Sequence, residues 1–452
     1  METEQGISGN NFEFTDGTLY SKKNKVCYFY HEDSGNYHYG VGHPMKPHRA
    51  RLTDDLLNAY GTKCYMDHLI PATPDFEMLT QFHSKDYLEF LQCLNSENVV
   101  DYADHIEKFN VRDDSPVFDG LWEFCQLYCG GTLGAAQLLA CGKYQFGINW
   151  SGGLHHGKKH EASGQLIQLL HSFYLYSCYQ LIGFCYLNDC VLAVLEFLKQ
   201  FQRVAYVDID IHHGDGVEEA FYMSSRVMCV SFHKYGDYFP GTGALYDIGA
   251  SGGKGFSVNV PLKDGMTDKM FEILFKQVMD LVFTYFSPDA ILLQSGADSL
   301  AGDRLGCFNL TVSGHSTAVN YLSKKNLPLL VLGGGGYTLR NVPKCWAVET
   351  GILTAAPLPL QIPETSKYRY YYGPEFTLDV RPSNMINLNT TKALEDIVRQ
   401  INENLRNYVF PTSTQIYGSN DESRAQDLLP FYMRTLTNED FNDETHHDVD
   451  LI

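Results

Sequence analysis

Arg203-Val-Ala-Tyr-Val-Asp-Ile-Asp-Ile-His-His-Gly-Asp-Gly216 joins an apolar run to a cluster of polar side chains. The β-branched residues at its start predict a buried strand. Polar residues then come at alternate positions, and side chains two apart on an extended chain point the same way. We therefore expect Asp210 and His212 to reach one ion from the same side. A carboxylate paired with a neutral imidazole suits Zn²⁺ or another first-row divalent metal.

The same pattern, an apolar run followed by polar residues, recurs along the chain. The predicted strands are 26–30, 146–150, 204–207, 227–230, 290–293 and 329–332. Helical patterns lie between them, for example at 189–201 and at 267–286, which Thr267 and Asp268 are suited to begin. Strands that alternate with helices predict a mostly parallel sheet. Because ligands bind beyond the carboxyl ends of such strands, we expect the polar residues there to converge.

Three parts are expected along the chain: a polar extension at 1–23, one large α/β domain at 24–415 and an acidic, disordered tail at 416–452. Near the start of the domain, residues 35–44 are rich in Gly and aromatic residues and are typical of a functional loop. A helical pattern follows Thr53, which we expect to cap that helix.

The chain is acidic, because its 452 residues include 34 Lys and Arg against 54 Asp and Glu, a formal net charge of -20. A field of this sign repels nucleic acid and favours cationic partners, although many soluble proteins are acidic without such a role. The 12 Cys include no C-x-x-C pair, which argues against a zinc ribbon or a thioredoxin motif. The first residues lack the features of a signal peptide, so we expect a reducing, intracellular compartment.

An open catalytic zinc site needs a third protein ligand and leaves one position for water or substrate. Asp298 follows a predicted strand of its own and completes the set Asp210, His212 and Asp298. Water bound to such a metal loses a proton near neutral pH and becomes a nucleophile. The alternative is that Asp298 only caps a loop.

Two adjacent imidazoles, His155 and His156, follow Gly-Gly at the end of another predicted strand. Asp208 and Asp215 flank the metal pair in sequence and are available to pair with them. A His–Asp pair fixes the tautomer and raises the basicity of the ring, so two pairs predict a general base and an electrostatic partner. A lone His is more often structural, but two adjacent ones at a strand end favour a catalytic role.

A tetraglycine, Leu332-Gly-Gly-Gly-Gly-Tyr337, allows a sharp bend that brings Tyr337 close to the metal. A phenol there donates a hydrogen bond to a developing oxyanion. The glycines are alternatively a phosphate cradle, but the Lys and Ser/Thr of a P-loop are missing. Together these residues indicate a mononuclear metal amidohydrolase or esterase.

Over residues 24–415 the chain also resembles the class I histone deacetylases. The matching stretches are Gly40-Val-Gly-His-Pro-Met-Lys-Pro-His-Arg49, Asn149-Trp-Ser-Gly-Gly-Leu-His-His156, Phe184-Cys-Tyr-Leu-Asn-Asp189, Gln294-Ser-Gly-Ala-Asp-Ser-Leu300, 333–337 and the segment at 203–216. The ending Asp448-Val-Asp-Leu-Ile452 resembles the histone deacetylase 3 branch of that family. The resemblance implies an eight-stranded parallel sheet of the arginase/deacetylase fold and hydrolysis of N6-acetyl-lysine in histone tails and other proteins. It also implies nuclear corepressor complexes as partners, transcriptional repression, location in the nucleus and also the cytoplasm, and no direct binding to nucleic acid or membrane.

The resemblance assigns roles to the site residues. It places zinc on Asp210, His212 and Asp298, pairs His155 with Asp208 and His156 with Asp215, favours His156 as the base and sets Tyr337 on the scissile carbonyl. The substrate-binding residues that it implies are Asp114 at the rim and Gly164, Phe184, Phe239 and Leu305 along a narrow tube. It implies potassium at Asp208, Asp210, His212, Ser231 and Phe232. An inositol tetrakisphosphate pocket is implied at His38, Gly42, Lys46, Arg304 and Arg340, for which ordinary surface charge is the alternative.

Four features depart from the pattern of the family or of that branch. Tyr238-Phe239 has one Phe where the histone deacetylase 3 branch has two, and Ala244 replaces a usual Asp. Ser115 stands where the family usually has Cys.

Residues 165–183 separate Gly164 from Phe184 and contain no Asp, Glu, Lys or Arg. A retained intron, a real loop and a membrane segment are three interpretations, and the uncharged, Leu- and Tyr-rich composition favours the intron. We therefore expect a form without these residues to be the active enzyme.

The sequence is also compatible with other functions. A deacetylase of small acetylated amines would use the same fold, and so would a ureohydrolase with two manganese ions, which needs more carboxylates. A catalytically impaired corepressor scaffold is the alternative from a different functional class.

Overall fold

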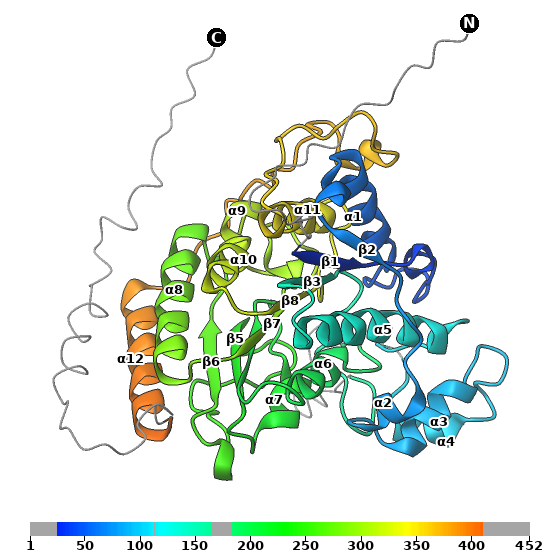
Figure 1. The fold of residues 1–452 in the computed structure, drawn as a ribbon, viewed down its shortest axis with the longest axis horizontal. Helices are drawn as coiled ribbons and strands as arrows, with labels where there is room; N and C mark the ends of the chain where they lie inside the picture. Colours follow the sequence, from blue (N-terminus) through cyan, green and yellow to red (C-terminus); the bar gives the residue numbers. More distant parts are fainter. Residues whose placement is uncertain (1–24, 113, 164–182, 410–452) are drawn as a thin grey trace, which may run out of the picture.

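Eight parallel strands form the central sheet, in the spatial order β2-β1-β3-β8-β7-β4-β5-β6 (Figure 1). The structure is a computed structural model that describes residues 25–112, 114–163 and 183–409. The strands are β1 Val26–Phe29, β2 Asp67–Leu69, β3 Phe146–Asn149, β4 Val204–Asp208, β5 Val227–Lys234, β6 Ser257–Leu262, β7 Ala290–Gln294 and β8 Leu329–Leu332. The fold class expected from the sequence, one α/β domain with an eight-stranded parallel sheet, is confirmed.

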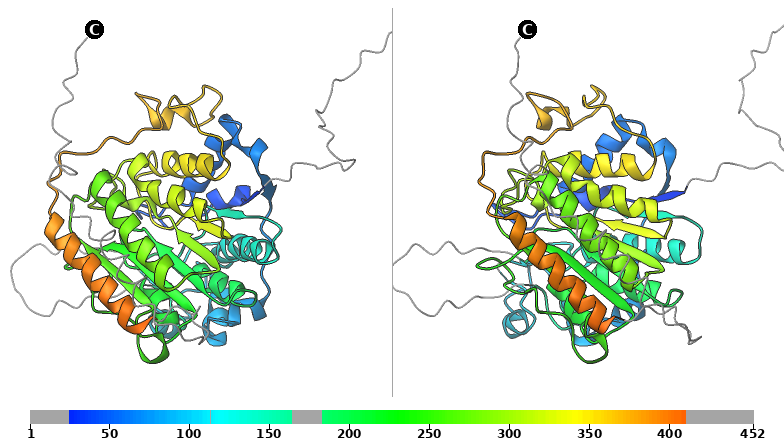
Figure 2. Two further views of the ribbon diagram at one scale, coloured as in Figure 1. Left: turned by 60° about the vertical axis from the view of Figure 1, so that its left-hand side comes forward. Right: turned by 90° about the vertical axis from the view of Figure 1, so that its left-hand side faces the viewer.

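Helices cover both faces of the sheet (Figures 1 and 2). Because alternate residues of a strand point to opposite faces, Val204 and Tyr206 pack with one helix layer and Ala205 and Val207 with the other. The first layer contains α5 Leu121–Ala140, α6 Asp189–Phe197 and α7 Asp215–Phe221. The second layer contains α1 His48–Ala59, α8 Asp268–Tyr285, α9 Val312–His315, α10 Thr317–Leu322 and α11 Val342–Leu353. Outside it, α12 Thr391–Tyr408 lies along α8, as Figure 2 shows.

A third apolar cluster lies beside the sheet, where α2 Phe76–Thr80, α3 Lys85–Cys93 and α4 Ala103–Lys108 pack near the start of α5. This cluster includes Phe184 and Tyr186, so it supports one wall of the predicted substrate tube. The 3-10 helices are η1 Glu32–Gly35, η2 Thr62–Tyr65, η3 Ser251–Gly253, η4 Ala297–Ser299, η5 Ser323–Lys325 and η6 Arg369–Tyr372.

The cap expected at Thr53 is wrong. Helix α1 begins earlier, at His48 after Pro47, and Thr53 lies in its interior. The buried Thr53 hydroxyl donates to the carbonyl of Arg49 at 2.9 Å, one turn back, so it is satisfied inside the helix. The helix predicted at 267–286 is confirmed as α8, with Thr267 at its N-cap position.

Some expectations fall outside the described residues. These are the extension at 1–23, the acidic tail at 416–452, Gly164 and all but the last residue of the segment 165–183. Within the described residues, no helix is long and apolar enough to cross a membrane.

Candidate active site

Four adjacent strands, β3, β8, β7 and β4, bring the predicted site residues together. The two histidines follow β3, the tetraglycine and Tyr337 follow β8, Asp298 follows β7, and Asp210 and His212 follow β4. Parallel strands present all their carboxyl ends at one edge, so residues far apart in sequence meet there.

Asp210, His212 and Asp298 form a buried cluster whose ligand atoms all lie within 4.8 Å of one another. His212 Nδ1 lies 3.1 Å from Asp210 Oδ1 and 3.1 Å from Asp298 Oδ2. Strand β4 ends at Asp208, so Asp210 and His212 converge from a loop and not from the alternation of a strand. Backbone amides hold both carboxylates, since Gly335 donates to Asp210 at 2.8 Å and Ile211 donates to Asp298 at 3.0 Å.

The donor set fits a divalent cation. Burial, reinforced by the charge of Asp210, raises the pKa of Asp298 to about 7. Burial opposes the charged form of His212, but the two carboxylates raise its pKa to about 10. Carboxylate oxygens and imidazole nitrogens are donors that zinc accepts, three such donors are the number that an open site needs, and a bound cation would relieve the repulsion between the acids.

The two His–Asp pairs expected from the sequence are present. His155 Nδ1 lies 2.7 Å from Asp208 Oδ2, and His156 Nδ1 lies 2.7 Å from Asp215 Oδ1. The rings face each other with their Nε2 atoms 3.0 Å apart, a distance at which one nitrogen donates to the other. Lys158 completes the second pair through an ion pair of 2.7 Å with Asp215.

These contacts separate the two imidazoles electrostatically. Burial opposes the charge on His155, but Asp208 and Asp210 raise its pKa to about 9. Burial and the neighbouring charge of His155 lower the pKa of His156 to about 3. At neutral pH the arrangement favours a protonated His155 beside a neutral His156.

Aromatic side chains surround the cluster. The Phe239 ring lies 5.0 Å from that of His156, and the Phe184 ring lies 5.5 Å from that of Tyr337, both edge to face. Burial and the nearby carboxylates, Asp298 first, hold the pKa of Tyr337 well above its ordinary value, so its phenol remains a hydrogen-bond donor. Leu305 is half-buried near this wall, and its carbonyl accepts from Tyr238 at 2.8 Å.

A buried arginine without a predicted role holds the tetraglycine in place. Arg49, on α1, donates to the carbonyl of Gly336 at 2.7 Å and to that of Gly334. Its guanidinium lies 5.2 Å from the ring centre of Trp346. An Arg on the buried face of a helix is the signal that points to such a contact, since a buried guanidinium needs carbonyl or carboxylate partners.

The remaining candidates lie around the site. Asp114 is half-buried, and its carbonyl accepts from His43 at 3.1 Å. Ser231 and Phe232 are buried in β5, where Ser231 pairs with Asp208 of β4 across the sheet. Gly164 is not described, but its neighbour Ser163 is, and the carbonyls of Ser163 and Gly183 both accept from Ser115 Oγ at 3.1 Å.

Four of the five residues predicted to bind inositol phosphate lie in one region. Arg304 donates to the carbonyl of Gly42 at 3.3 Å and Lys46 to that of Gly40 at 3.4 Å. Nearby His38 accepts from the amide of Gly40 at 3.0 Å. Burial and the charge of Arg304 lower the pKa of Lys46, so two cations are held close together.

The fifth residue, Arg340, lies on a different loop. Exposed Arg340 lines a cavity of about 270 Å³ together with Lys344 and Arg381. Hydrogen bonds from Tyr337 and Thr338 amides to Asp303 tie the loop that carries Arg340 to the turn that carries Arg304.

The eight-stranded parallel sheet, with a buried Asp-His-Asp cluster beyond its strands, defines an α/β enzyme of the arginase/deacetylase fold. The histone deacetylase domain family matches residues 43–353. Histone deacetylase 1 of Homo sapiens is 52% identical over 384 residues, which cover 85% of this chain and 76% of that protein. Probable histone deacetylase 1-B of Xenopus laevis is 50% identical over 405 residues, 90% of this chain and 80% of that protein. Histone deacetylase 19 of Arabidopsis thaliana is 52% identical over 383 residues, 85% of this chain and 72% of that protein.

The chain therefore belongs to the class I histone deacetylase family and is a histone deacetylase enzyme. These relatives are histone deacetylase 1 and 19 proteins, so the finer expectation, a likeness to the histone deacetylase 3 branch, is not confirmed.

Proposed function

We propose that this chain hydrolyses N6-acetyl-lysine in histone tails and other proteins, with zinc held by Asp210, His212 and Asp298, and releases lysine and acetate. The convergence of these three buried side chains beside two His–Asp pairs carries the proposal. A mononuclear site suits hydrolysis of an amide, whereas a ureohydrolase with two manganese ions needs more carboxylates.

When bound, zinc supplies Lewis-acid chemistry, which polarises a carbonyl oxygen and makes water more acidic. His156 accepts the proton of the attacking water, because its ring lies against the tube residue Phe239 and Asp215 fixes its Nδ1–H. His155, held by Asp208, supports this step electrostatically. Tyr337 donates its phenolic hydrogen to the oxygen that becomes negative in the tetrahedral transition state.

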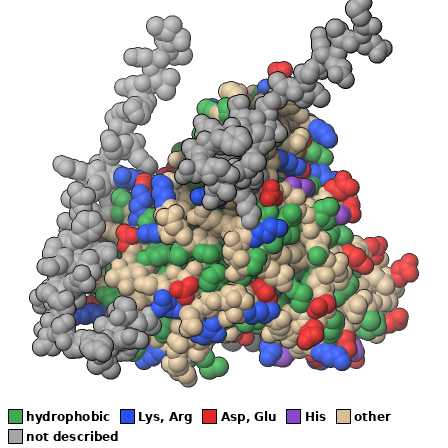
Figure 3. Space-filling view, in the orientation of Figure 1, with side chains coloured by type: hydrophobic (Ala, Val, Ile, Leu, Met, Phe, Trp, Pro, Cys, Tyr) green, Lys and Arg blue, Asp and Glu red, His purple; other side chains and the backbone are tan. Residues whose placement is uncertain are grey.

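The walls and the surface suit an acetyl-lysine within a basic tail. The acetylated side chain is neutral and slender, so it fits a tube lined by Phe184 and Phe239. Figure 3 shows acidic side chains over the side of the molecule formed by α2–α4. The exposed acids on and between these helices are Asp86, Glu89, Glu97, Asp101, Asp104 and Glu107. They favour a cationic histone tail around the acetyl-lysine.

The test is turnover of two substrates by the purified chain loaded with zinc. An acetyl-histone peptide should be hydrolysed with a higher kcat/KM than an acetylpolyamine. A preference for the acetylpolyamine would identify a small-amine deacetylase, and zinc binding without turnover of either substrate would identify a scaffold.

Partners and further ions belong to the same proposal. We infer action in a nuclear corepressor complex, in the nucleus and also in the cytoplasm, as part of transcriptional repression. The adjacency of Asp208 and Ser231 supports a potassium ion held by Asp208, Asp210, His212, Ser231 and Phe232. Assignment to the histone deacetylase 3 branch rests on the C-terminal sequence Asp448-Val-Asp-Leu-Ile452.

Replacing Arg304 and Arg340 with Ala should abolish activation by a corepressor fragment with inositol tetrakisphosphate. Each charge-assisted bond lost is worth about 1.5–3 kcal/mol, so affinity for the inositol phosphate should fall about 100-fold or more. Calorimetric titration and the activity of the complex measure these effects. The double variant Arg399→Ala and Arg406→Ala, on α12, is the matched control for loss of two exposed charges. Unchanged activation in the first variant would show that the five residues are ordinary surface charge.

Removing residues 165–183, so that Phe184 follows Gly164, should give a folded and fully active enzyme, whereas the longer chain should be impaired. The flanks already meet, because Ser163 and Cys185 exchange two hydrogen bonds of 2.9 Å and Ser115 bridges Ser163 to Gly183. Activity and Tm of both forms, with a search of native protein for peptides from the segment, make the comparison. Equal activity together with native peptides would show that the segment is a genuine part of the enzyme.

A further inference from the structure

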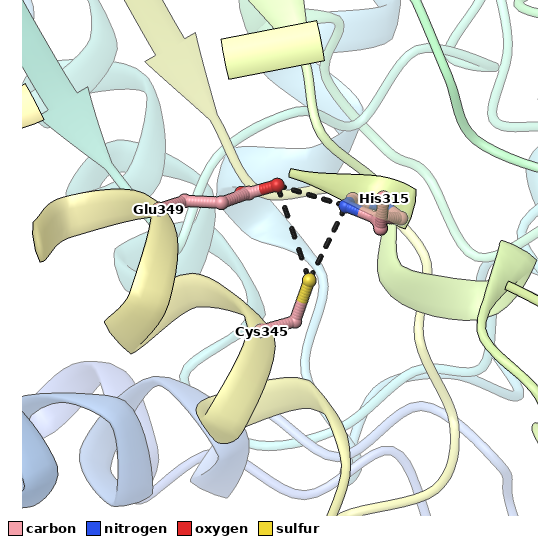
Figure 4. Close-up of side chains that lie close together, drawn as sticks. All are labelled: His315, Cys345 and Glu349. Atoms are coloured by element: carbon pink, nitrogen blue, oxygen red, sulfur yellow. Dashed lines mark hydrogen bonds and ion pairs between the residues drawn. The ribbon is translucent and has the colours of Figure 1, made fainter. Parts of the chain in front are cut away.

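A second buried cluster lies behind the active site, formed by His315 at the end of α9 and by Cys345 and Glu349, one turn apart on α11 (Figure 4). His315 Nδ1 lies 2.8 Å from Glu349 Oε1 and 3.2 Å from Cys345 Sγ. All three side chains are completely buried. Burying a carboxylate and an imidazole costs free energy unless both are paired and fully hydrogen-bonded, so we expect this cluster to have a role that offsets the cost.

Both charged members of the cluster also reach the segment that carries Asp298. His315 Nε2 donates to the carbonyl of Gly296 at 2.8 Å. The second oxygen of Glu349 accepts from Ser295 Oγ at 2.8 Å. Both ring nitrogens of His315 therefore have hydrogen-bond partners, an arrangement that suits an imidazolium paired with the Glu349 carboxylate. Burial opposes this charge, but the Glu349 carboxylate holds the pKa of His315 well above its ordinary value.

The segment from Ser295 to Asp298 has little freedom to move without disturbing the metal cluster. A Cβ at Gly296 would lie 2.1 Å from Asp210 Oδ2, so the backbone there lies directly against one carboxylate. The amide of Gly296 donates to Gln294 Oε1 at 2.8 Å, and Gln294 Nε2 donates to the same Asp210 oxygen at 2.9 Å. Asp298, the third ligand, lies two residues further along the chain.

We propose that His315 and Glu349 are positioning residues for the metal site. They fix the Gly296 carbonyl and the Ser295 hydroxyl. These contacts set the Asp298 and Asp210 carboxylates at the spacing that zinc requires. The proposal rests on the proposed zinc-dependent function. The pair bonds the segment that carries Asp298, through Ser295 Oγ and the Gly296 carbonyl. Outer partners of metal sites usually bond the side chain of the ligand itself.

A second metal ion in the cluster explains the contacts less well. Both His315 nitrogens and both Glu349 oxygens have hydrogen-bond partners within the described residues. The 2.8 Å separation of Nδ1 and Oε1 is that of a charge-assisted hydrogen bond. Burial raises the pKa of Cys345 to about 11, so its thiol stays protonated. The cluster is complete without an ion, and Cys345 forms its hydrogen bonds within the cluster, with His315 and Glu349.

The test compares wild type with a double variant that carries both His315→Leu and Glu349→Leu. The two changes are made together so that no buried charge is left unpaired. A second variant, Glu349→Gln, keeps the hydrogen bonds with a neutral His315. The control is Cys345→Ala, which removes the third member of the cluster. Zinc affinity is measured by chelator competition and metal analysis, kcat and KM with an acetyl-lysine peptide, and stability by Tm.

The double variant should bind zinc about 10- to 100-fold more weakly, as removal of outer partners of metal sites does. Its kcat should fall at limiting zinc with KM for the peptide unchanged, because Phe184 and Phe239 are untouched. Glu349→Gln should recover most of the zinc affinity, and Cys345→Ala should match wild type. A loss of Tm with zinc affinity intact would show a purely structural pair, and a second zinc equivalent lost with the pair would show a metal site; either result overturns the proposal. Failure of the proposed function is distinct, since wild type itself would then bind no zinc.

Discussion

Replacing Tyr337 with Phe is expected to lower kcat by about 10²- to 10³-fold while zinc remains bound, because one hydrogen bond to the oxyanion is lost. The ring itself should stay in place, since its edge-to-face contact with Phe184 at 5.5 Å does not involve the hydroxyl. KM for an acetyl-lysine peptide should change little, because the hydroxyl acts on charge that develops only in the transition state.

The matched control is Tyr238→Phe. Tyr238 also lies in the site, with its ring stacked on His212 at 5.2 Å, but its hydroxyl donates to the carbonyl of Leu305 and not toward the metal cluster. Steady-state kinetics and zinc content of the two variants separate loss of an oxyanion donor from loss of any tyrosine hydroxyl near the metal. Turnover by Tyr337→Phe as fast as by Tyr238→Phe would remove Tyr337 from the mechanism.

The sheet could be predicted where strands are fully buried. The run at 329–332 is apolar throughout because helices cover both faces of the sheet there, and it is β8 without a change of bounds. Strands β2 and β6 were missed, and both lie at the edges of the sheet. β2 is the short, polar Asp67-His-Leu69, and β6 contains Pro261, which an edge strand tolerates because it needs no amide on its open side.

The site could be predicted for the same topological reason. Asp210, His212, Asp298 and the two histidines all follow strands, and parallel strands share one functional edge. Asp210 and His212 lie beyond the end of β4, so they converge through the loop after the strand and not through the strand alternation that we expected.

The residues around the site could not be predicted in this way. Arg49 acts from α1 on the tetraglycine, and His315 and Glu349 act from α9 and α11 on the segment before Asp298. Contacts between a helix and a loop depend on how the two pack, and no periodicity in the sequence encodes them. Cys345 and Glu349, four apart on a helix, were a local signal, but nothing near His315 pointed to them.

Replacing Asp298 with Asn should abolish zinc binding at stoichiometric metal and lower deacetylation by about 10³-fold or more. The metal contributes several kcal/mol of transition-state stabilisation, and each 1.36 kcal/mol is about tenfold in rate. Asn keeps the size of the side chain, and its amide oxygen can still accept from Ile211, so the fold should persist. Because burial beside Asp210 already raises the pKa of Asp298, loss of one charge should leave the metal-free protein at least as stable as wild type.

The control for this variant lies at the other end of the same strand. Asp289 precedes β7, and its carboxylate accepts from the amide of Arg203 at 2.9 Å, far from the metal cluster in the strand's register. Asp289→Asn should retain zinc and activity. The two variants are compared by metal analysis, by deacetylation of an acetyl-lysine peptide and by the Tm of the metal-free proteins. Stoichiometric zinc in Asp298→Asn would remove Asp298 from the ligand set, and normal activity without zinc would reject metal-dependent hydrolysis altogether.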